Sequence, residues 1–251
     1  MTPPNTQPRL FVDAALTAEG RLRLDGVQAH YVNHVMRLGA GDGVVLFNGR
    51  DGEWSADIEA LGKNRCSVVI GRRLRPQEAE HGPWLAFAPI KKAGTDFLVE
   101  KATELGASRL LPTITRRTNS ARVNLNRLHA HAVEASEQCG RLTVPEIEAP
   151  AALERLASGW PADRRLLVLD ESGEGQPIAD VLADLKGGGS DPPPSCGFLS
   201  GPEGGFDPGE LDALRKLDFV NAVGLGSRIL RAETAALAAL ACWQALIGDR
   251  P

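Results

Sequence analysis

Long apolar runs, closely spaced cysteines and a positive charge excess are all missing from this sequence. No apolar stretch reaches the roughly 18–20 residues that a membrane-spanning helix needs. Only four cysteines occur in 251 residues, and no two form a Cys-x-x-Cys pair, so we expect free thiols rather than a disulfide framework or a zinc site. The polar, proline-rich start at residues 1–8 does not resemble a signal peptide. We therefore expect a cytoplasmic protein without a bound metal or membrane attachment.

The net charge is negative but unevenly distributed. The formal charge of −4, taken alone, argues against nucleic acid, because phosphate binding usually needs a basic surface. Residues 1–75 carry ten basic against eight acidic side chains, residues 76–150 carry nine of each, and residues 151–251 carry nine against fifteen. The acidic excess thus lies at the C-terminal end, and the total charge does not exclude an RNA partner for the N-terminal region.

The first third of the sequence predicts a small β-domain. Short apolar or alternating runs, typical of strands, occur at 9–13, 43–49, 54–58 and 66–70. Residues 30–38 have apolar side chains at helical spacing and stop at a glycine. Several short strands at close spacing favour a small barrel over residues 1–75. A polar, apolar-poor stretch at 76–83 is the expected linker.

From residue 84 onward, strand and helix patterns alternate. The predicted strands are 84–88, 109–112, 166–169, 196–199 and 220–225. The predicted helices are 94–106, 125–139, 177–185, 208–217 and 232–247. Such alternation is typical of an α/β protein with a mainly parallel sheet and helices on both faces. We therefore predict an α/β domain over residues 84–251.

A glycine-rich loop follows the predicted strand at 196–199. Ser200-Gly-Pro-Glu-Gly-Gly-Phe206 leads into Asp207-Pro208, a strong start signal for a helix. The connection from the carboxyl end of a strand to the amino end of a helix is where open α/β sheets bind ligands. The loop is neither a P-loop nor a GxGxxG fingerprint. A plain strand–helix connection is the alternative interpretation.

A second loop of this kind precedes the alanine-rich last helix. It reads Leu225-Gly-Ser-Arg-Ile-Leu-Arg-Ala-Glu-Thr234. Gly226 permits a close approach of the main chain to a ligand, and Arg228, Arg231 and Glu233 are polar where a buried connection would hold apolar residues. A capped helix start with an Arg–Glu pair is the alternative. Because two such loops follow strands near the C-terminus, the pair favours a cofactor site.

Other polar residues give weaker signals. His30 and His34 lie four positions apart and would share a helix face. A metal would need further ligands that the sequence does not place nearby, so a polar surface is the simpler interpretation. The candidate phosphate contacts, which could equally be solvated surface, are Arg9, Arg37, Arg116 and Arg117.

With these motifs, the chain resembles the ribosomal RNA small subunit methyltransferase E family, SPOUT-class enzymes that methylate N3 of a uridine in 16S rRNA. The strongest motifs are Gly201-Pro-Glu-Gly-Gly-Phe206 and Leu225-Gly-Ser-Arg-Ile-Leu-Arg-Ala-Glu-Thr-Ala235, supported by Lys101-Ala-Thr-Glu-Leu-Gly106, Glu134-Ala-Ser-Glu-Gln138 and Val35-Met-Arg-Leu38. The resemblance implies a PUA-like RNA-binding barrel and a SPOUT domain with a deep C-terminal trefoil knot. It also implies S-adenosylmethionine as cofactor and a homodimer.

The resemblance places the cofactor between the two loops. Carried over residue by residue, one wall is formed by Leu199, Ser200, Gly201, Pro202, Glu203, Gly204 and Gly205, and the other by Leu225, Gly226, Ser227, Ile229, Leu230 and Arg231. Main-chain groups of such loops can hydrogen-bond adenine and ribose, while leucine and isoleucine side chains cover the adenine. The family often has an Arg-Ser pair where this chain has Arg116-Arg117, so which arginine faces RNA stays open.

The implied chemistry needs a proton acceptor and a stabilising cation. Uracil N3 is a weak acid, so its deprotonation, or stabilisation of the resulting anion, would assist methyl transfer. Glu203 is the candidate base, and Arg231 is the candidate group for stabilising charge on the uracil oxygens. The target base must be unpaired or flipped out, since pairing covers N3. Two other functions stay open: a SPOUT methyltransferase acting on ribose 2′-oxygen, and a non-catalytic RNA-binding assembly factor.

Overall fold

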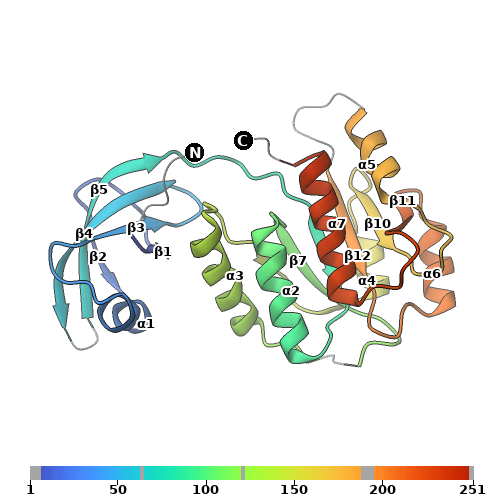
Figure 1. Ribbon diagram of the computed structural model, residues 1–251, viewed down its shortest axis with the longest axis horizontal. Helices are drawn as coiled ribbons and strands as arrows, with labels where there is room; N and C mark the ends of the chain where they lie inside the picture. Colours follow the sequence, from blue (N-terminus) through green and yellow to red (C-terminus); the bar gives the residue numbers. More distant parts are fainter. Residues whose placement is uncertain (1–6, 63–64, 120–121, 188–194, 249–251) are drawn as a thin grey trace. The chain divides into compact units, whose positions relative to one another are not determined.

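The computed structural model describes residues 7–62, 65–119, 122–187 and 195–248 (Figure 1). The chain forms two compact units, which we describe separately. Unit 1 comprises Met1–Glu80 together with Ser136–Val144, and unit 2 comprises His81–Ala135 and Pro145–Pro251. The division after Glu80 falls inside the linker expected at 76–83. No sequence pattern indicated that Ser136–Val144 belongs with the N-terminal unit.

Unit 1 is built on a five-stranded sheet with the order β1-β3-β4-β5-β2. The strands are β1 (Arg9–Phe11), β2 (Arg21–Leu24), β3 (Gly43–Phe47), β4 (Glu53–Gly62) and β5 (Arg65–Arg75). β1 runs parallel to β3, and the other pairs are antiparallel. Register shifts between β4 and β5 increase the local bend and twist of these long strands. The sheet encloses an apolar core that includes Leu10, Val44, Ile58 and Val68.

The helix expected at 30–38 begins earlier and changes type. α1 (Gly26–His30) starts after Asp25, whose carboxylate accepts a hydrogen bond from the Gln28 main-chain N–H at 2.7 Å. The chain then continues into a single π-helical stretch, η1 (Tyr31–Val35). Such stretches are rare and often lie at functional sites. The sequence prediction missed the Asp25 cap and therefore placed the helix start too late.

Unit 2 contains a parallel sheet. Its strands follow the order β11-β13-β10-β12-β6-β7-β8, with β9 paired to β7, and every pair is parallel. The bounds are β6 (Trp84–Phe87), β7 (Arg109–Ile114), β8 (Glu146–Ile147), β9 (Ala151–Ala152), β10 (Arg165–Leu169), β11 (Gln176–Pro177), β12 (Cys196–Ser200) and β13 (Val220–Gly224). Leu166, Leu167 and Val168 are fully buried, as expected for a central strand covered on both faces.

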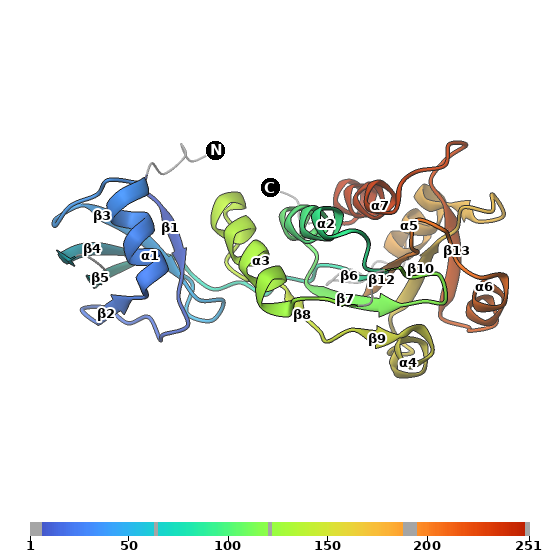
Figure 2. The same ribbon diagram turned by 90° about the horizontal axis from the view of Figure 1, so that it is seen from below.

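Helices cover both faces of this sheet (Figure 2). On one face, α7 (Ala232–Leu246) packs between α2 (Lys92–Glu104) and α5 (Ile178–Gly187). On the other face lie α4 (Leu153–Gly159) and α6 (Pro208–Arg215), whose leucines join the core around Trp160. α3 (Leu125–Cys139) begins in unit 2, and its last residues belong to unit 1. Across the described ranges, no helix has the length and apolar character to cross a bilayer.

Near the C-terminus, the last strand of the chain lies between two strands that precede it in the sequence. β13 lies between β10 and β11, although β11 follows β10 in the sequence. The connection at 170–175 therefore spans the end of β13, and a Cβ atom on Gly175 would lie 2.6 Å from the Val223 carbonyl carbon. After β13 the chain returns past this connection to pack α7 on β12. This crossing agrees with the expected trefoil knot, and the predicted α/β class is confirmed.

Candidate functional site

Both glycine-rich loops leave the sheet at the same edge. β10 lies between β12 and β13, and the three strands are parallel. The first loop (residues 201–207) and the second loop (residues 225–231) therefore both start at carboxyl ends, where open α/β sheets bind ligands. The Ser200 hydroxyl donates to the Ala232 main-chain oxygen at 3.0 Å. This bond fixes the start of the first loop against the start of α7.

The first loop is held in place by its own hydrogen bonds. Gly205 has a φ of 68° and donates its N–H to the Pro202 carbonyl at 2.9 Å. The Asp207 carboxylate accepts from the Gly209 N–H at 3.0 Å, while the Glu210 carboxylate accepts from the Asp207 N–H at 3.1 Å. The Glu210–Asp207 bond is half of a capping box at the start of α6, in which the Asp207 carboxylate also accepts from the Glu210 N–H. The first loop is therefore formed before any ligand binds.

Arg116 and Arg117, two of the candidate phosphate contacts, reach this first loop. The Arg116 N–H donates to Glu210 at 2.8 Å, and its guanidinium pairs with Asp207 at 2.7 Å. The Arg117 guanidinium donates to the Gly204 carbonyl at 2.9 Å. Arg116 keeps 62% of its side chain exposed in this pair, and Arg117 is exposed as well. The structure thus joins the candidate RNA contacts to the candidate cofactor loop.

The second loop is open. The main-chain N–H groups of residues 226–230 make no hydrogen bond within the part of the chain that the structure describes. Gly226 has a φ of 105°, and a Cβ atom there would meet nothing within 4 Å. The Ile229 side chain is 88% exposed. Unpaired amides beside an exposed apolar side chain suit a ligand that combines polar edges with a flat apolar face, such as a nucleoside.

A third segment, residues 170–175 after β10, lies between the two loops and was not predicted. The buried Asp170 carboxylate pairs with Arg215 at 2.6 Å and accepts the Ser172 N–H at 2.8 Å. Burial acts to raise the pKa of Asp170, but Ser172 and Arg215 outweigh it, so the pKa lies below its ordinary value. A Cβ on Gly205 would collide with the Glu171 carboxylate. The signal was available, because these polar residues directly follow a predicted strand.

The remaining candidate residues differ in their accessibility. Leu199 is fully buried in the core, so only its main chain is available to a ligand, and its predicted place in the pocket wall does not extend to its side chain. Glu203 and Arg231, the candidate catalytic residues, are both exposed. Neither side chain has an ion pair or hydrogen bond to another described residue. Both are thus free to meet a substrate.

The two candidate RNA contacts in unit 1 have opposite environments. Arg9 is only 13% exposed and pairs with Glu53 at 2.7 Å. It also donates to three main-chain oxygens, those of Ser136, Glu137 and Arg141. A phosphate would have to displace these partners, so we leave Arg9 out of the proposed RNA surface and assign it to holding the segment Ser136–Val144. Arg37, in contrast, is exposed.

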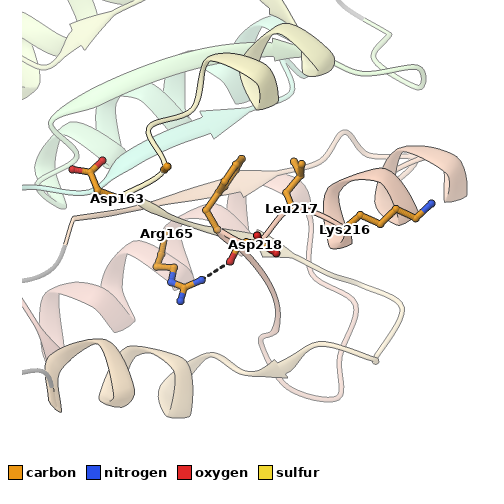
Figure 3. A pocket seen from close by; sticks show the side chains of 7 residues that line it. Asp163, Arg165, Lys216, Leu217 and Asp218 are labelled. Carbon is orange, nitrogen blue, oxygen red and sulfur yellow. Dashed lines mark hydrogen bonds between the residues drawn. The ribbon is translucent and has the colours of Figure 1, made fainter.

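A surface hollow of about 530 Å³ lies at the opposite edge of the sheet (Figure 3). It is lined by Ala162, Asp163, Arg165, Lys216, Leu217, Asp218 and Phe219. These residues stand near the amino ends of β10 and β13, and the Arg165 guanidinium donates to the Asp218 main-chain oxygen at 2.6 Å. The hollow contains none of the candidate residues. Because ligands of open α/β sheets bind at carboxyl ends, we do not assign it to the cofactor.

Comparisons with known proteins show the family and the fold of the chain. The family model of the RNA methyltransferase domain matches residues 79–244, and that of the RNA methyltransferase PUA domain matches residues 24–71. A ribosomal RNA small subunit methyltransferase E from Rickettsia conorii is 34% identical over 93% of each chain. The Neisseria gonorrhoeae protein of that name, solved bound to S-adenosyl methionine, is 27% identical with a TM-score of 0.85, covering 96% of this chain and 98% of that one. A putative methyltransferase from Legionella pneumophila, solved with the same cofactor, is 26% identical with a TM-score of 0.83 over 96% and 98%.

Fold and loops together define an RNA methyltransferase that combines a PUA-like domain with a SPOUT-type α/β domain. Within that class, the chain belongs to the ribosomal RNA small subunit methyltransferase E family. The resemblance seen in the sequence and the expected fold class are thereby confirmed. The open amides of residues 226–230, the space beside Gly226 and the exposed Ile229 also fit S-adenosylmethionine, the expected cofactor.

Proposed function

We propose that this protein transfers a methyl group from S-adenosylmethionine to N3 of a specific uridine in 16S rRNA. The observation that carries the proposal is the pairing of a preformed glycine loop with an open one at the carboxyl edge of a parallel sheet. Membership of the ribosomal RNA small subunit methyltransferase E family supports the RNA substrate. The choice of N3 rests on the family resemblance in the two loop motifs.

The cofactor would lie between the two loops. When bound, S-adenosylmethionine supplies an already activated methyl group, so the chain has only to align it and to manage one proton. On one side are the residues of the first loop, together with Ser200 and the main chain of Leu199. On the other side are the free amides of residues 226–230, with Leu225, Ile229 and Leu230 covering the adenine.

Glu203 and Arg231 would act on the uracil. A hydrogen bond between Ser200 and Ala232 ties the first loop to α7. Glu203 follows Ser200 by three residues, and Arg231 directly precedes Ala232. From these places Glu203 would accept the N3 proton, and Arg231 would stabilise the charge that develops on the uracil oxygens. A Glu203→Gln variant that methylates at the normal single-turnover rate would remove Glu203 from this role.

The RNA partner would be 16S rRNA within an assembled or assembling small subunit in the cytoplasm. Arg37, Arg116 and Arg117 are exposed cations and would contact phosphates. Removing one such contact should lower the salt dependence of RNA binding by about one unit of log–log slope. We also propose that the protein works as a homodimer, which sedimentation at micromolar concentration would detect.

The decisive experiment is methyl transfer to undermodified small subunits. The purified protein is incubated with labelled S-adenosylmethionine and subunits from cells lacking this methylation, and the RNA is digested for mass spectrometry. Labelled 3-methyluridine is the expected product, mapping to one nucleotide. A ribose-methylated nucleoside would instead identify a 2′-oxygen methyltransferase. Absence of both transfer and cofactor binding by calorimetry would identify a non-catalytic RNA-binding assembly factor.

A further inference from the structure

The surface of unit 1 carries an aromatic pair that its fold does not explain. The imidazole rings of His30 and His34 lie 4.7 Å apart between centroids, tilted by 40°. Both side chains are exposed, and no carboxylate among the described residues pairs with either. Ala29 and Val32 from the same helical segment point into the core. The histidine pair therefore lies on the outer face of α1 and η1, where a solvated helix usually presents flexible charged side chains.

Two apolar residues and a strained arginine flank this pair. Val27 is 80% exposed and Val35 is 60% exposed. Arg37 has a φ of 56°. This left-handed conformation is unfavourable for residues with a side chain, and after a helix it is usually adopted by glycine. A non-glycine residue kept in such a conformation suggests that its side chain is needed. We call the set Val27, His30, His34, Val35 and Arg37 the α1 surface.

We propose that the α1 surface binds single-stranded RNA, with unpaired bases stacking on His30 and His34 and a phosphate meeting Arg37. Exposed aromatic rings next to a cation are the combination that single strands use, because every base has a flat face and every nucleotide a negative charge. Val27 and Val35 extend the apolar platform. The proposal rests on the proposed function only in taking RNA as the ligand.

Two other occupants explain the surface less well. Two imidazoles alone make an incomplete metal site, and the described residues contain no group of three or more metal-binding side chains. A second copy of the chain would bury Val27 and Val35, but it would not explain why an arginine is kept at a positive φ. Both possibilities give distinct results in the test below.

The test measures binding of a fluorescent oligouridylate and of purified small subunits by three variants. His30→Ala/His34→Ala removes the rings and should weaken binding of both probes about tenfold or more. His34→Phe keeps a stacking surface and should bind within about twofold of the native protein. Arg37→Gly removes the cation, should weaken binding, and should reduce the salt slope by about one. His129→Ala, a change at an exposed histidine of unit 2, serves as the matched control.

The readouts separate this proposal from its rivals and from the proposed function. Unfolding midpoints and S-adenosylmethionine affinity should stay unchanged in the histidine variants, and turnover on saturating subunits should persist with a raised KM. Unchanged RNA binding by His30→Ala/His34→Ala overturns the proposal, as does equal loss in His34→Phe. A changed oligomeric state or zinc affinity with unchanged RNA binding also overturns it. If instead the methylated product is not 3-methyluridine, the proposed function is wrong. The proposal for the α1 surface is then still decided by the RNA-binding measurements alone.

Discussion

The two loops of the site both connect a strand to a helix but are stabilised in different ways. The first loop is tied by the capping box of α6, by Arg116 and by Arg117, and Gly205 leaves room for Glu171. The second loop has a glycine at φ 105°, and the main-chain N–H groups of residues 226–230 donate no hydrogen bond to another described residue. One wall of the site is thus rigid before binding, and the other is left for the ligand to complete.

Because of this difference, the two loops should contribute differently to folding stability and to cofactor affinity. Polar groups that are already bonded contribute to folding, whereas unpaired exposed amides contribute only when a ligand arrives and must then offset the ordering of the loop. Changes in the second loop should therefore weaken cofactor binding more than they lower stability. Changes in the first loop and its supports should lower both.

The largest effect is expected at Gly226 in the second loop. Gly226→Ala places a Cβ in the space left for a ligand and forces a side chain into a φ of 105°. S-adenosylmethionine affinity should fall roughly 100-fold, equal to about 2.7 kcal/mol. Calorimetry measures the affinity, and urea unfolding should show a smaller loss of about 1–2 kcal/mol, because alanine rarely adopts a positive φ. Gly140→Ala is the matched control, because Gly140 of unit 1 also has a positive φ (84°) and open space for a Cβ. Equal affinity in native protein and Gly226→Ala would remove the second loop from the site.

The next effect concerns Asp170, the buried support between the loops. The pKa of Asp170 is lower in the folded protein, so its contribution to stability is present above its unfolded pKa of about 3.9 and is lost as pH falls through the folded value. Asp170→Asn weakens the pairing with Arg215, and the free energy of unfolding at neutral pH should drop by about 2 kcal/mol. Urea unfolding of both proteins from pH 7 to pH 3 measures this difference.

The difference between native protein and Asp170→Asn should begin to shrink below about pH 4, where the unfolded carboxyl takes up a proton, and should vanish once the folded carboxyl is protonated as well. Cofactor affinity should fall as well, since residues 170–175 lie against Gly205 and Val223. A difference in unfolding free energy that is constant over the whole pH range would show that the charge of Asp170 does not stabilise this segment.

The sequence predicted where the two loops lie but not how each is held. Strand and helix periodicity placed both loops at carboxyl ends, because that inference needs only local pattern. The partners of Arg9 could not be predicted, since Glu53 and the carbonyls of α3 come from distant parts of the chain. The burial of Leu199 likewise depends on packing against other strands. Crossing of the chain at 170–175 has no signature in periodicity, so the knot was expected only from the family resemblance.

Three segments that the sequence did not predict correctly have explanations in their own local sequence or geometry. The helix at 153–159 is short and lacks a capping side chain, and its start signal is correspondingly weak. The π-helical η1 (Tyr31–Val35) departs from the 3.6-residue period on which the prediction depended. Residues 170–175 were passed over although they satisfy the same rule as the two loops. Applying that rule to every predicted strand would have found Asp170 and Glu171.

A smaller effect is expected at Glu210 beneath the first loop. Its buried carboxylate accepts hydrogen bonds from the N–H groups of Asp207 and Arg116. Glu210→Ala leaves both donors without this partner and should cost about 1–2 kcal/mol of unfolding free energy, with a several-fold loss of cofactor affinity. Glu210→Gln can still complete a capping box and should lose less. Unfolding in urea and calorimetry measure the two quantities, and an Ala variant that loses affinity at full stability would contradict a preformed first loop.

The smallest effect compares one arginine from each loop region. Arg117 donates to the Gly204 carbonyl, whereas the exposed Arg228 makes no hydrogen bond or ion pair with another described residue. Arg117→Ala should weaken S-adenosylmethionine binding about twofold to fivefold, because one exposed hydrogen bond contributes roughly 0.5–1 kcal/mol. Arg228→Ala should leave both stability and the position of the first loop unchanged. If Arg228→Ala weakens cofactor binding more than Arg117→Ala, the second loop binds the cofactor through a side chain as well as its main chain. The two loops would then not differ in the way described above.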